Sequence, residues 1–449
     1  MTTLARKLRG IDYFTLGWGT MVGVGWLVVM DDWLLRGGVL GAILGFAIGG
    51  ALLFPVAYVY GRLVRAIPDA AGEVAYTAEV FPPSVSFATG WMMVLSYFIV
   101  CPWEAVAVGK IASYIFPALD SVELYRIAGR PVYLPHLLIG LALIALLTLL
   151  NYRGIRSSAS FQNWTAFGTL ALFVTFVAVG VTKGSVGNFP PLFTHGRFVS
   201  ILLVIQIVPY FMTGYESSVK GAEEASPDFD ARGFSKAMAT AIAVGILFYT
   251  MIIAAVGYVA PWRQLTEQKF MTAVAFEQAV GSRAIVGAIL GAALLSLVKC
   301  FNGNFVAASR LLFAMARRGM VANTLARIHS RNHTPYHAVI WVGMVTAVCM
   351  FLGDAILVPV TEVGSVASAV GWLAACAAYH QMRPSPGQRS VAIVGAVVGL
   401  LMVLMKIVPF VPGHFSRYEW LVLGLWGLLG IVLKRSRRTA RVLSGEAIR

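Results

Sequence analysis

Four glycines interrupt the first membrane-length apolar segment of this chain. Residues 17–32 read GWGTMVGVGWLVVMDD, so the glycine-rich stretch runs directly into two adjacent carboxylates, Asp31 and Asp32. Inside hydrocarbon every backbone N–H and C=O needs a protein partner, and non-helical backbone therefore occurs there only where it lines a cavity or binds a ligand. The pattern predicts a broken helix with a substrate site at the break, an arrangement typical of transporters.

The remainder of the chain is also built for a bilayer. Of its 449 residues 58% are hydrophobic and only 12% are charged, whereas soluble domains carry about 25% charged residues. We therefore expect an all-α polytopic membrane protein. Apolar segments that approach the roughly 20 residues of a spanning helix predict about twelve transmembrane helices, near 11–35, 38–61, 84–116, 133–151, 157–182, 198–220, 236–260, 283–316, 336–352, 357–380, 390–410 and 418–434.

The basic residues predict the orientation of these spans. Most of the 35 lysines and arginines, including Arg62, Arg65, Arg317 and Arg318, fall at span ends on the same side as the N-terminus. Basic loops are retained on the cytoplasmic side, so we expect a multi-pass protein of the cell membrane with both termini in the cytoplasm. Because the basic residues are scattered over loops, the net charge of +15 does not indicate a nucleic-acid partner.

A second interruption is predicted five spans after the first. Residues 206–224 read QIVPYFMTGYESSVKGAEE, in which Pro209 removes a backbone donor and Gly214 weakens the helix, so we expect a break near 210–214. Matching breaks in the first and sixth spans are the pattern of two opposed five-helix repeats. The chain then divides into a first repeat at 1–195, a second at 196–385, and spans eleven and twelve with a basic tail at 386–449.

Three segments resemble one known family, the amino acid, polyamine and organocation transporters, which share the leucine-transporter fold. They are the glycine-rich 19–26 (GTMVGVGW), the sixth-span end and loop at 214–233, and ASRLLFAMARRGMVANTLARIHSRNHTP at 308–335. The resemblance implies a bacterial amino acid permease type with a leucine-transporter-like 5+5 inverted repeat and broken helices 1 and 6. Family members often carry a lysine on the fifth helix for proton coupling, and this chain has Thr169 in its place.

The two breaks together suit the head group of an amino acid. Amide groups freed near 21–25 favour a carboxylate, and carbonyl groups freed near 210–213 accept from an ammonium. Aromatic side chains beside the breaks are candidate walls, although a single aromatic residue in a membrane helix more often serves packing or the interface. The predicted substrate-binding residues are Met21, Val22, Gly23, Val24, Gly25, Trp26, Trp103, Tyr210, Phe211, Met212, Thr213, Gly214 and Asn304.

Ionisable residues inside the spans are a second set of candidates. A charge at the bilayer centre costs at least about 2.5 kcal/mol, so such side chains face a cavity or pair with one another. They either bind a cationic substrate or exchange a proton, with Lys299 standing in for a coupling cation, or they form static ion pairs. Lys406 is a further basic residue within a predicted span. The predicted coupling or gating residues are Asp31, Glu104, Glu216, Lys299 and Arg310.

Three classes of function compete. A secondary transporter working by alternating access fits the paired breaks, whereas a membrane enzyme would need a nucleophile with a base or clustered metal ligands, which the sequence does not offer. A channel or substrate sensor built on the same scaffold is a third alternative that the sequence does not exclude. No G-x-x-x-x-G-K-[ST] motif occurs, so we expect no drive by ATP, and energy from a proton or sodium gradient or from exchange. His333 and His337 have no carboxylate or cysteine partners at ligand spacing, and we expect no cofactor or metal. The acidic residues favour cationic or plain amines, such as basic amino acids, polyamines or ethanolamine, and a neutral amino acid is also fully compatible with the sequence.

Overall fold

The computed structural model describes residues 8–230, 232–268 and 270–443, with side chains for all of these except 155–158, 356, 358 and 435–443. The termini for which a cytoplasmic location is predicted, residues 1–7 and 444–449, lie outside the described residues. Up to residue 196 the elements are α1 (Gly10–Met21), α2 (Gly25–Val28), α3 (Met30–Ala51), α4 (Phe54–Ala66), α5 (Glu73–Ala78), α6 (Pro83–Phe98), α7 (Val100–Ile115), η1 (Pro117–Leu119), β1 (Glu123–Ile127), β2 (Arg130–Tyr133), α8 (Leu134–Arg153), α9 (Ile155–Lys183) and η2 (Val186–Asn188).

The second part of the chain is also mostly helical. Its elements are α10 (Arg197–Ile205), α11 (Val208–Met212), α12 (Ser217–Lys220), η3 (Ala222–Glu224), α13 (Arg232–Val259), η4 (Trp262–Gln264), α14 (Met271–Val280), α15 (Arg283–Arg317), η5 (Asn323–Ala326), α16 (Tyr336–Met350), η6 (Gly353–Ile356), α17 (Leu357–Gln381), α18 (Pro386–Ile407) and α19 (Arg417–Leu443).

Eight helical segments within the described residues are long and apolar enough to cross a membrane. Other predicted spans coincide with shorter or interrupted helices. The prediction 11–35 covers α1, α2 and the start of α3, the prediction 198–220 covers α10, α11 and α12, and α16 has 15 residues. The chain is therefore a mostly helical polytopic protein.

The helix α3 contains the turn between the first two predicted spans. Gly38 has a φ of 67°, which places it in the left-handed region inside the helix. A side chain there would also meet the carbonyl oxygen of Leu192 at 2.5 Å. Glycine avoids both the conformational strain and this close approach, so the segment after Gly38 starts the second span.

The prediction of an all-α protein is wrong for one short segment. β1 and β2 form an antiparallel hairpin in which Ile127 lies opposite Arg130. Ala128 and Gly129 both have positive φ, as a two-residue type I′ turn requires. The hairpin lies between two predicted spans, where the sequence ELYRI-AG-RPVY favours strands rather than a helix.

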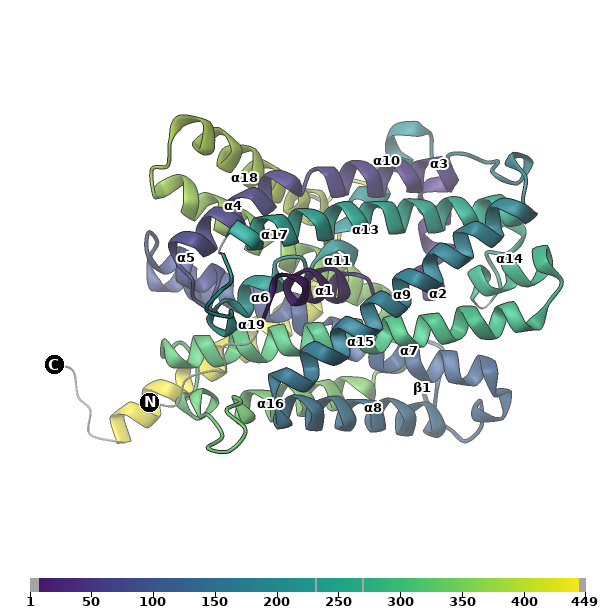
Figure 1. Cartoon of the computed structure of the whole chain (residues 1–449). Helices are drawn as coiled ribbons and strands as arrows, with labels where there is room; N and C mark the ends of the chain where they lie inside the picture. The colour runs from purple at the N-terminus through teal and green to yellow at the C-terminus, as the bar shows by residue number, and fades with distance from the viewer. Residues whose placement is uncertain (1–7, 231, 269, 444–449) are drawn as a thin grey trace.

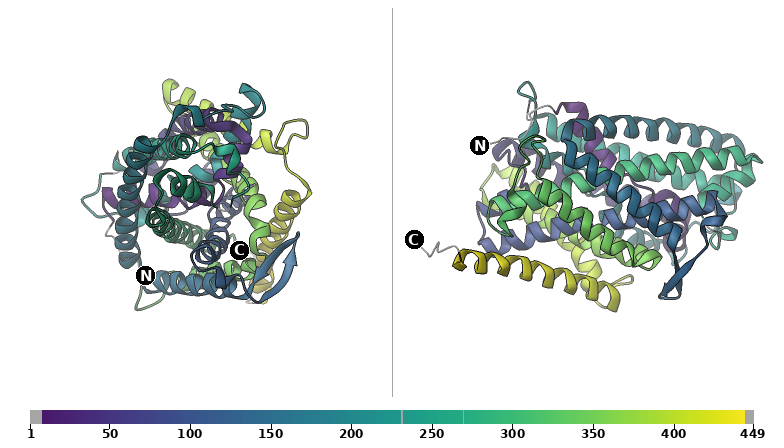
Figure 2. Two further views of the ribbon diagram at one scale, coloured as in Figure 1. Left: turned by 90° about the vertical axis from the view of Figure 1, so that its right-hand side faces the viewer. Right: turned by 90° about the horizontal axis from the view of Figure 1, so that it is seen from below.

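The long helices run between two ends of one bundle (Figure 1). One end carries β2, which contacts both β1 and η6, and we call it the hairpin end. The other, which we call the opposite end, carries the ion pair between Asp69 and Arg318. Viewed along the bundle in Figure 2, the helices form a rounded cross-section with the hairpin at its edge, and α19 runs along the outside. The short α1 and α11 lie inside, with α13, α15 and α17 packed against them.

Candidate functional site

The first interruption lies between α1 and α2. α1 ends at Met21 and α2 begins at Gly25, so the carbonyl groups of the last turn of α1 need partners from elsewhere. One face of α15 supplies them. Lys299 Nζ donates to the carbonyl oxygens of Gly19 (3.1 Å) and Val22 (2.5 Å). Asn304 Nδ2 donates to the carbonyl oxygen of Thr20 (2.9 Å). Ser296 Oγ lies within hydrogen-bond distance of the carbonyl oxygens of Val22 (3.1 Å) and Gly23 (2.8 Å).

Lys299 is the charged member of this set. Its side chain is fully buried, and Nζ also lies 4.5 Å from the centre of the Trp18 ring. Carbonyl groups at a helix C-terminus carry partial negative charge, and an aromatic face adds to it. An ammonium group therefore already occupies the cation-attracting end of α1.

The second interruption follows α11. Pro209 lies in the first turn of this five-residue helix, and Thr213 has extended backbone. Gly214 has a φ of 114°, and a side chain there would lie 2.9 Å from the backbone nitrogen of Met21. The two interrupted helices thus touch backbone to backbone at this glycine.

Tyr249 of α13 joins the two interruptions. Its hydroxyl lies 3.2 Å from the carbonyl oxygen of Met21 and 2.9 Å from that of Phe211. These carbonyl groups lie in the last turns of α1 and α11, so one buried phenol bridges both half-helices through the single proton that its two contacts share. The arrangement fixes the distance between the two breaks.

A buried pocket lies between the two interruptions. Trp103 is 1% exposed and Tyr210 is 6% exposed, so the walls are closed from solvent. Residues of α1, α7, α11 and α15 contribute to it. The lining residues are Thr20, Met21, Gly23, Gly25, Val100, Trp103, Glu104, Tyr210, Phe211, Thr213 and Cys300.

Glu104 is the one charged side chain among these lining residues. It is 1% exposed, and its Oε1 accepts a hydrogen bond from the backbone nitrogen of Val24 at 3.4 Å. Oε2 has no hydrogen-bond partner among the described residues. One oxygen of the carboxylate therefore contacts the first break, and the other has no protein partner in the described part of the chain.

Sequence reasoning missed Thr20, Val100 and Cys300. Thr20 directly precedes the predicted set and Cys300 follows Lys299, so adjacency to known candidates was the available signal. Val100 is one of many valines in apolar spans and carries no signal. Its place in the pocket depends on how α7 packs against α11 and the first break.

Several predicted residues lie outside the lining. Val22, Val24, Met212 and Gly214 form backbone of the two breaks, and Asn304 bonds to Thr20 behind the pocket. Trp26 lines a separate apolar cavity with Thr169, Phe173, Phe176, Phe248, Ile252 and Ala292. Asp31 lies half-buried in the first turn of α3.

Glu216 is buried beside the second break and not in the pocket lining. Its two oxygens accept from the Thr213 hydroxyl (2.9 Å) and the Gly214 backbone nitrogen (3.1 Å). The Tyr97 hydroxyl lies 3.4 Å away. Glu216 thus holds the non-helical backbone between α11 and α12 in place.

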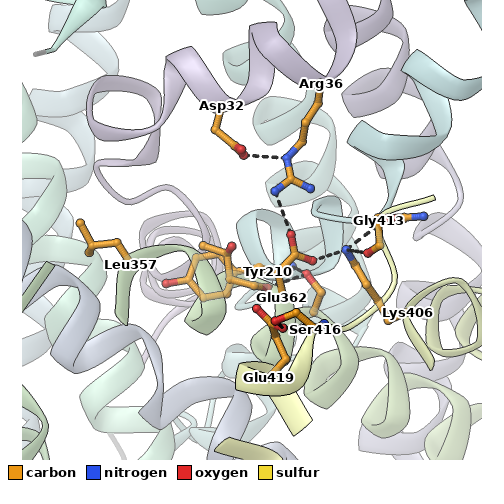
Figure 3. A network of polar contacts seen from close by, with 12 residues as sticks. Asp32, Arg36, Tyr210, Leu357, Glu362, Lys406, Gly413, Ser416 and Glu419 are labelled. Carbon is orange, nitrogen blue, oxygen red and sulfur yellow. Dashed lines mark hydrogen bonds and ion pairs between the residues drawn. The ribbon is translucent and has the colours of Figure 1, made fainter. Parts of the chain in front are cut away.

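A partly buried ionic network lies near the start of α17, which contacts η6 of the hairpin end, and Figure 3 shows its members. Arg36 bridges Asp32 (2.8 Å) on its own helix and Glu362 of α17 (2.9 Å). Lys406 of α18, which is fully buried, pairs with the same Glu362 and donates to the carbonyl oxygen of Gly413 at 3.1 Å. The network ties the segment after the first break to α17 and α18.

Four further ion pairs lie toward the opposite end. In two of them, Lys220 with Glu73 and Arg310 with Glu224, both partners are buried. Tyr60 also donates to Glu73, at 2.8 Å, and Arg310 is one of the predicted gating residues. The pairs are Lys220 with Glu73, Arg310 with Glu224 (3.3 Å), Arg317 with Glu223 (2.5 Å) and Arg318 with Asp69 (2.6 Å).

Within residues 8–230, 232–268 and 270–443, no group of three or more His, Cys, Asp or Glu side chains is placed to hold a metal ion. The polar groups around the two breaks are backbone amides and carbonyls, hydroxyls, the Asn304 amide, the Cys300 thiol, the carboxylates of Glu104 and Glu216 and the ammonium of Lys299. This donor set suits a small polar organic molecule.

Comparison with known proteins agrees with this geometry. The sequence model of a family described as amino acid permease matches residues 8–433. The chain belongs to this family. It is therefore a multi-pass transporter of the amino acid permease family and not an enzyme.

Characterised relatives align with most of this permease. The methylthioribose transporter of Bacillus subtilis is 24% identical, over 82% of this chain and 79% of its own length. The branched-chain amino acid permease BcaP of the same organism is 23% identical, over 83% of this chain and 79% of its own. The cystine/glutamate transporter of Homo sapiens is 28% identical, over 77% of this chain and 68% of its own.

Proposed function

We propose that this permease carries an amino acid or a related amine across the cell membrane by alternating access, driven by an ion gradient or by exchange. The observation that carries the proposal is the pocket whose walls come from both interrupted helices. A substrate bound there contacts both half-helix ends at once, so its release requires the helices to move. The relatives named as branched-chain amino acid and cystine/glutamate transporters support the same substrate range.

The proposed architecture is a leucine-transporter-like pair of opposed repeats in twelve spans. The first repeat comprises residues 1–195 and the second 196–385, with 386–449 outside the core. The two interruptions then occupy equivalent positions, as an inverted repeat requires. The hairpin end faces outward and the opposite end faces the cytoplasm, because the opposite end carries basic residues such as Arg62, Arg317 and Arg318.

In this scheme the ion-pair networks at the two ends are the gates. The network around Glu362 opens in the outward-facing state, and the pairs around Glu73 and Glu224 open in the inward-facing state. Ion pairs that close one face of a bundle and separate on rearrangement are a common switching device. Both sets are closed around the pocket here, so this conformation corresponds to an occluded state.

Lys299 supports a coupling mode without sodium. Its ammonium donates hydrogen bonds to the carbonyl oxygens of Gly19 and Val22. These oxygens carry partial negative charge and could otherwise bind a coupling cation. We propose that the lysine replaces such a cation. A coupling proton or a counter-substrate then supplies the energy.

Counterflow in proteoliposomes tests the transport proposal. Vesicles loaded with millimolar unlabelled substrate are diluted into tracer, with a panel of amino acids and amines tried in turn. Transient accumulation of tracer that saturates with concentration is expected for at least one compound. A compound that binds the purified protein and shows no counterflow would instead favour a substrate sensor on the transporter scaffold.

A further inference from the structure

The charge at the first break bears on the class of substrate. We infer that the pocket is built for an amine without an α-carboxylate, whose ammonium group is bound by Glu104. This inference rests on the proposed function and narrows it. A decarboxylated amine, and not its parent amino acid, is then the preferred substrate.

The unpartnered oxygen of Glu104 supplies the positive argument. Oε2 is buried and has no hydrogen-bond partner among the described residues, although it belongs to a side chain that is only 1% exposed. Buried polar atoms are nearly always hydrogen-bonded, and an unpaired buried carboxylate oxygen is costly. A substrate ammonium in the pocket satisfies it with a charge-assisted hydrogen bond.

Tyr210 offers a second contact in the same place. Its hydroxyl is buried and also lacks a partner among the described residues. Its ring lies 6.4 Å from that of Trp103 and 5.1 Å from that of Phe211, measured between centroids. Aromatic faces attract cations, so the pocket combines one carboxylate with three rings around the amine.

The same geometry argues against a substrate carboxylate. Glu104 Oε1 already accepts from the Val24 amide, which is the kind of donor that a substrate carboxylate would use. The ammonium of Lys299 is held by carbonyl oxygens behind the break, and Lys299 is not among the lining residues. A second carboxylate would therefore lie near Glu104 without a cation facing it, in a buried site where like charges repel strongly.

Matched pairs of compounds test this directly. The affinity of the purified full-length protein is measured by isothermal titration for phenethylamine and phenylalanine, isoamylamine and leucine, and putrescine and ornithine. In at least one pair the amine is expected to bind at least tenfold more tightly than its parent amino acid, a difference of about 1.4 kcal/mol. The wild-type ratio alone decides the point and needs no variant.

The variant Glu104→Gln then tests whether Glu104 binds the ammonium group of the substrate. The isosteric amide removes the charge, so amine affinity is expected to fall at least tenfold while the amine-to-amino-acid preference is lost. The matched control is Glu123→Gln, which removes a carboxylate from the exposed pair with Arg126 on the hairpin and is expected to leave affinity unchanged. If Glu104→Gln does not fold, Tyr210→Phe removes the second free polar group, and a fall in amine affinity is expected there.

The outcomes distinguish failure of the amine preference from failure of the transport proposal on which it rests. Amino acids that bind and exchange as well as or better than their amines would overturn the inference and leave the transport proposal standing. Amine binding unaffected by Glu104→Gln would overturn the assignment of the ammonium site. Absence of binding and counterflow for every pair would overturn both.

Discussion

Breaking the Glu362 network is expected to destabilise the protein by an amount that depends on which partner is removed. Removing one member of a buried ion pair costs about 3–5 kcal/mol, because the other charge stays buried without its partner. Glu362→Gln leaves the fully buried Lys406 with neutral acceptors only, which are Gln206 Oε1 at 3.2 Å and the Gly413 carbonyl. We therefore expect the free energy of unfolding to fall by about 5 kcal/mol.

Lys406→Met is expected to cost less. Glu362 keeps Arg36 as a partner at 2.9 Å, so no charge is left unpaired and the free energy of unfolding falls by about 2 kcal/mol. At about 2 °C per kcal/mol, Tm falls by about 10 °C for Glu362→Gln and about 4 °C for Lys406→Met. In the double variant the two losses are less than additive by about 2 kcal/mol, as for groups in direct contact.

The assay is thermal unfolding of the detergent-purified protein at one scan rate, followed by intrinsic fluorescence. Arg126→Met is the matched control, because its partner Glu123 lies on the hairpin surface and exposed pairs contribute about 1 kcal/mol or less. Losses for the Glu362 and Lys406 variants no larger than for this control would refute the reasoning. Strict additivity in the double variant would refute the direct pairing.

Three further outcomes are expected. Because the ammonium of Lys299 lies where a cation would bind, replacing sodium by potassium is expected to leave initial uptake within twofold, and a strict sodium requirement would contradict this role. Gly23→Ala would place a methyl group against the Glu104 carboxylate and 3.0 Å from the Cys300 thiol, so substrate affinity by isothermal titration is expected to fall at least tenfold. Gly287→Ala, with open space around it, is expected to bind normally, and equal losses in both would argue against the site. Lys220→Met orphans a buried carboxylate at the opposite end and is expected to lower stability by about 3–5 kcal/mol, seen as a lower Tm than for wild type.

Local signals predicted where the helices stop. The glycines at 23 and 25 and Pro209 act on their own backbone, so the interruptions of the first and sixth spans follow from a few adjacent residues. The hairpin at 123–133 was missed because a search for membrane-length apolar segments passes over a short strand pair.

Long-range contacts were not predictable in the same way. Glu104 is recognisable as a carboxylate in an apolar span, but its contact with Val24, 80 residues earlier, depends on how α7 packs beside the break. Trp26 was predicted as a wall of the site and instead lines a second cavity with Phe176, because a short half-helix points successive side chains in different directions. Lys406 was noticed without a partner, and Glu362 within 357–380 was overlooked.

The central claim is that substrate binds between the two interrupted helices. The most direct test is an experimental structure of the protein with the tightest-binding compound of the three matched pairs. We predict that the bound compound contacts Gly23 or Gly25 of the first break together with Tyr210 or Phe211 of α11, before the second break. Density in the cavity beside Trp26, or contacting one interrupted helix alone, would contradict the account.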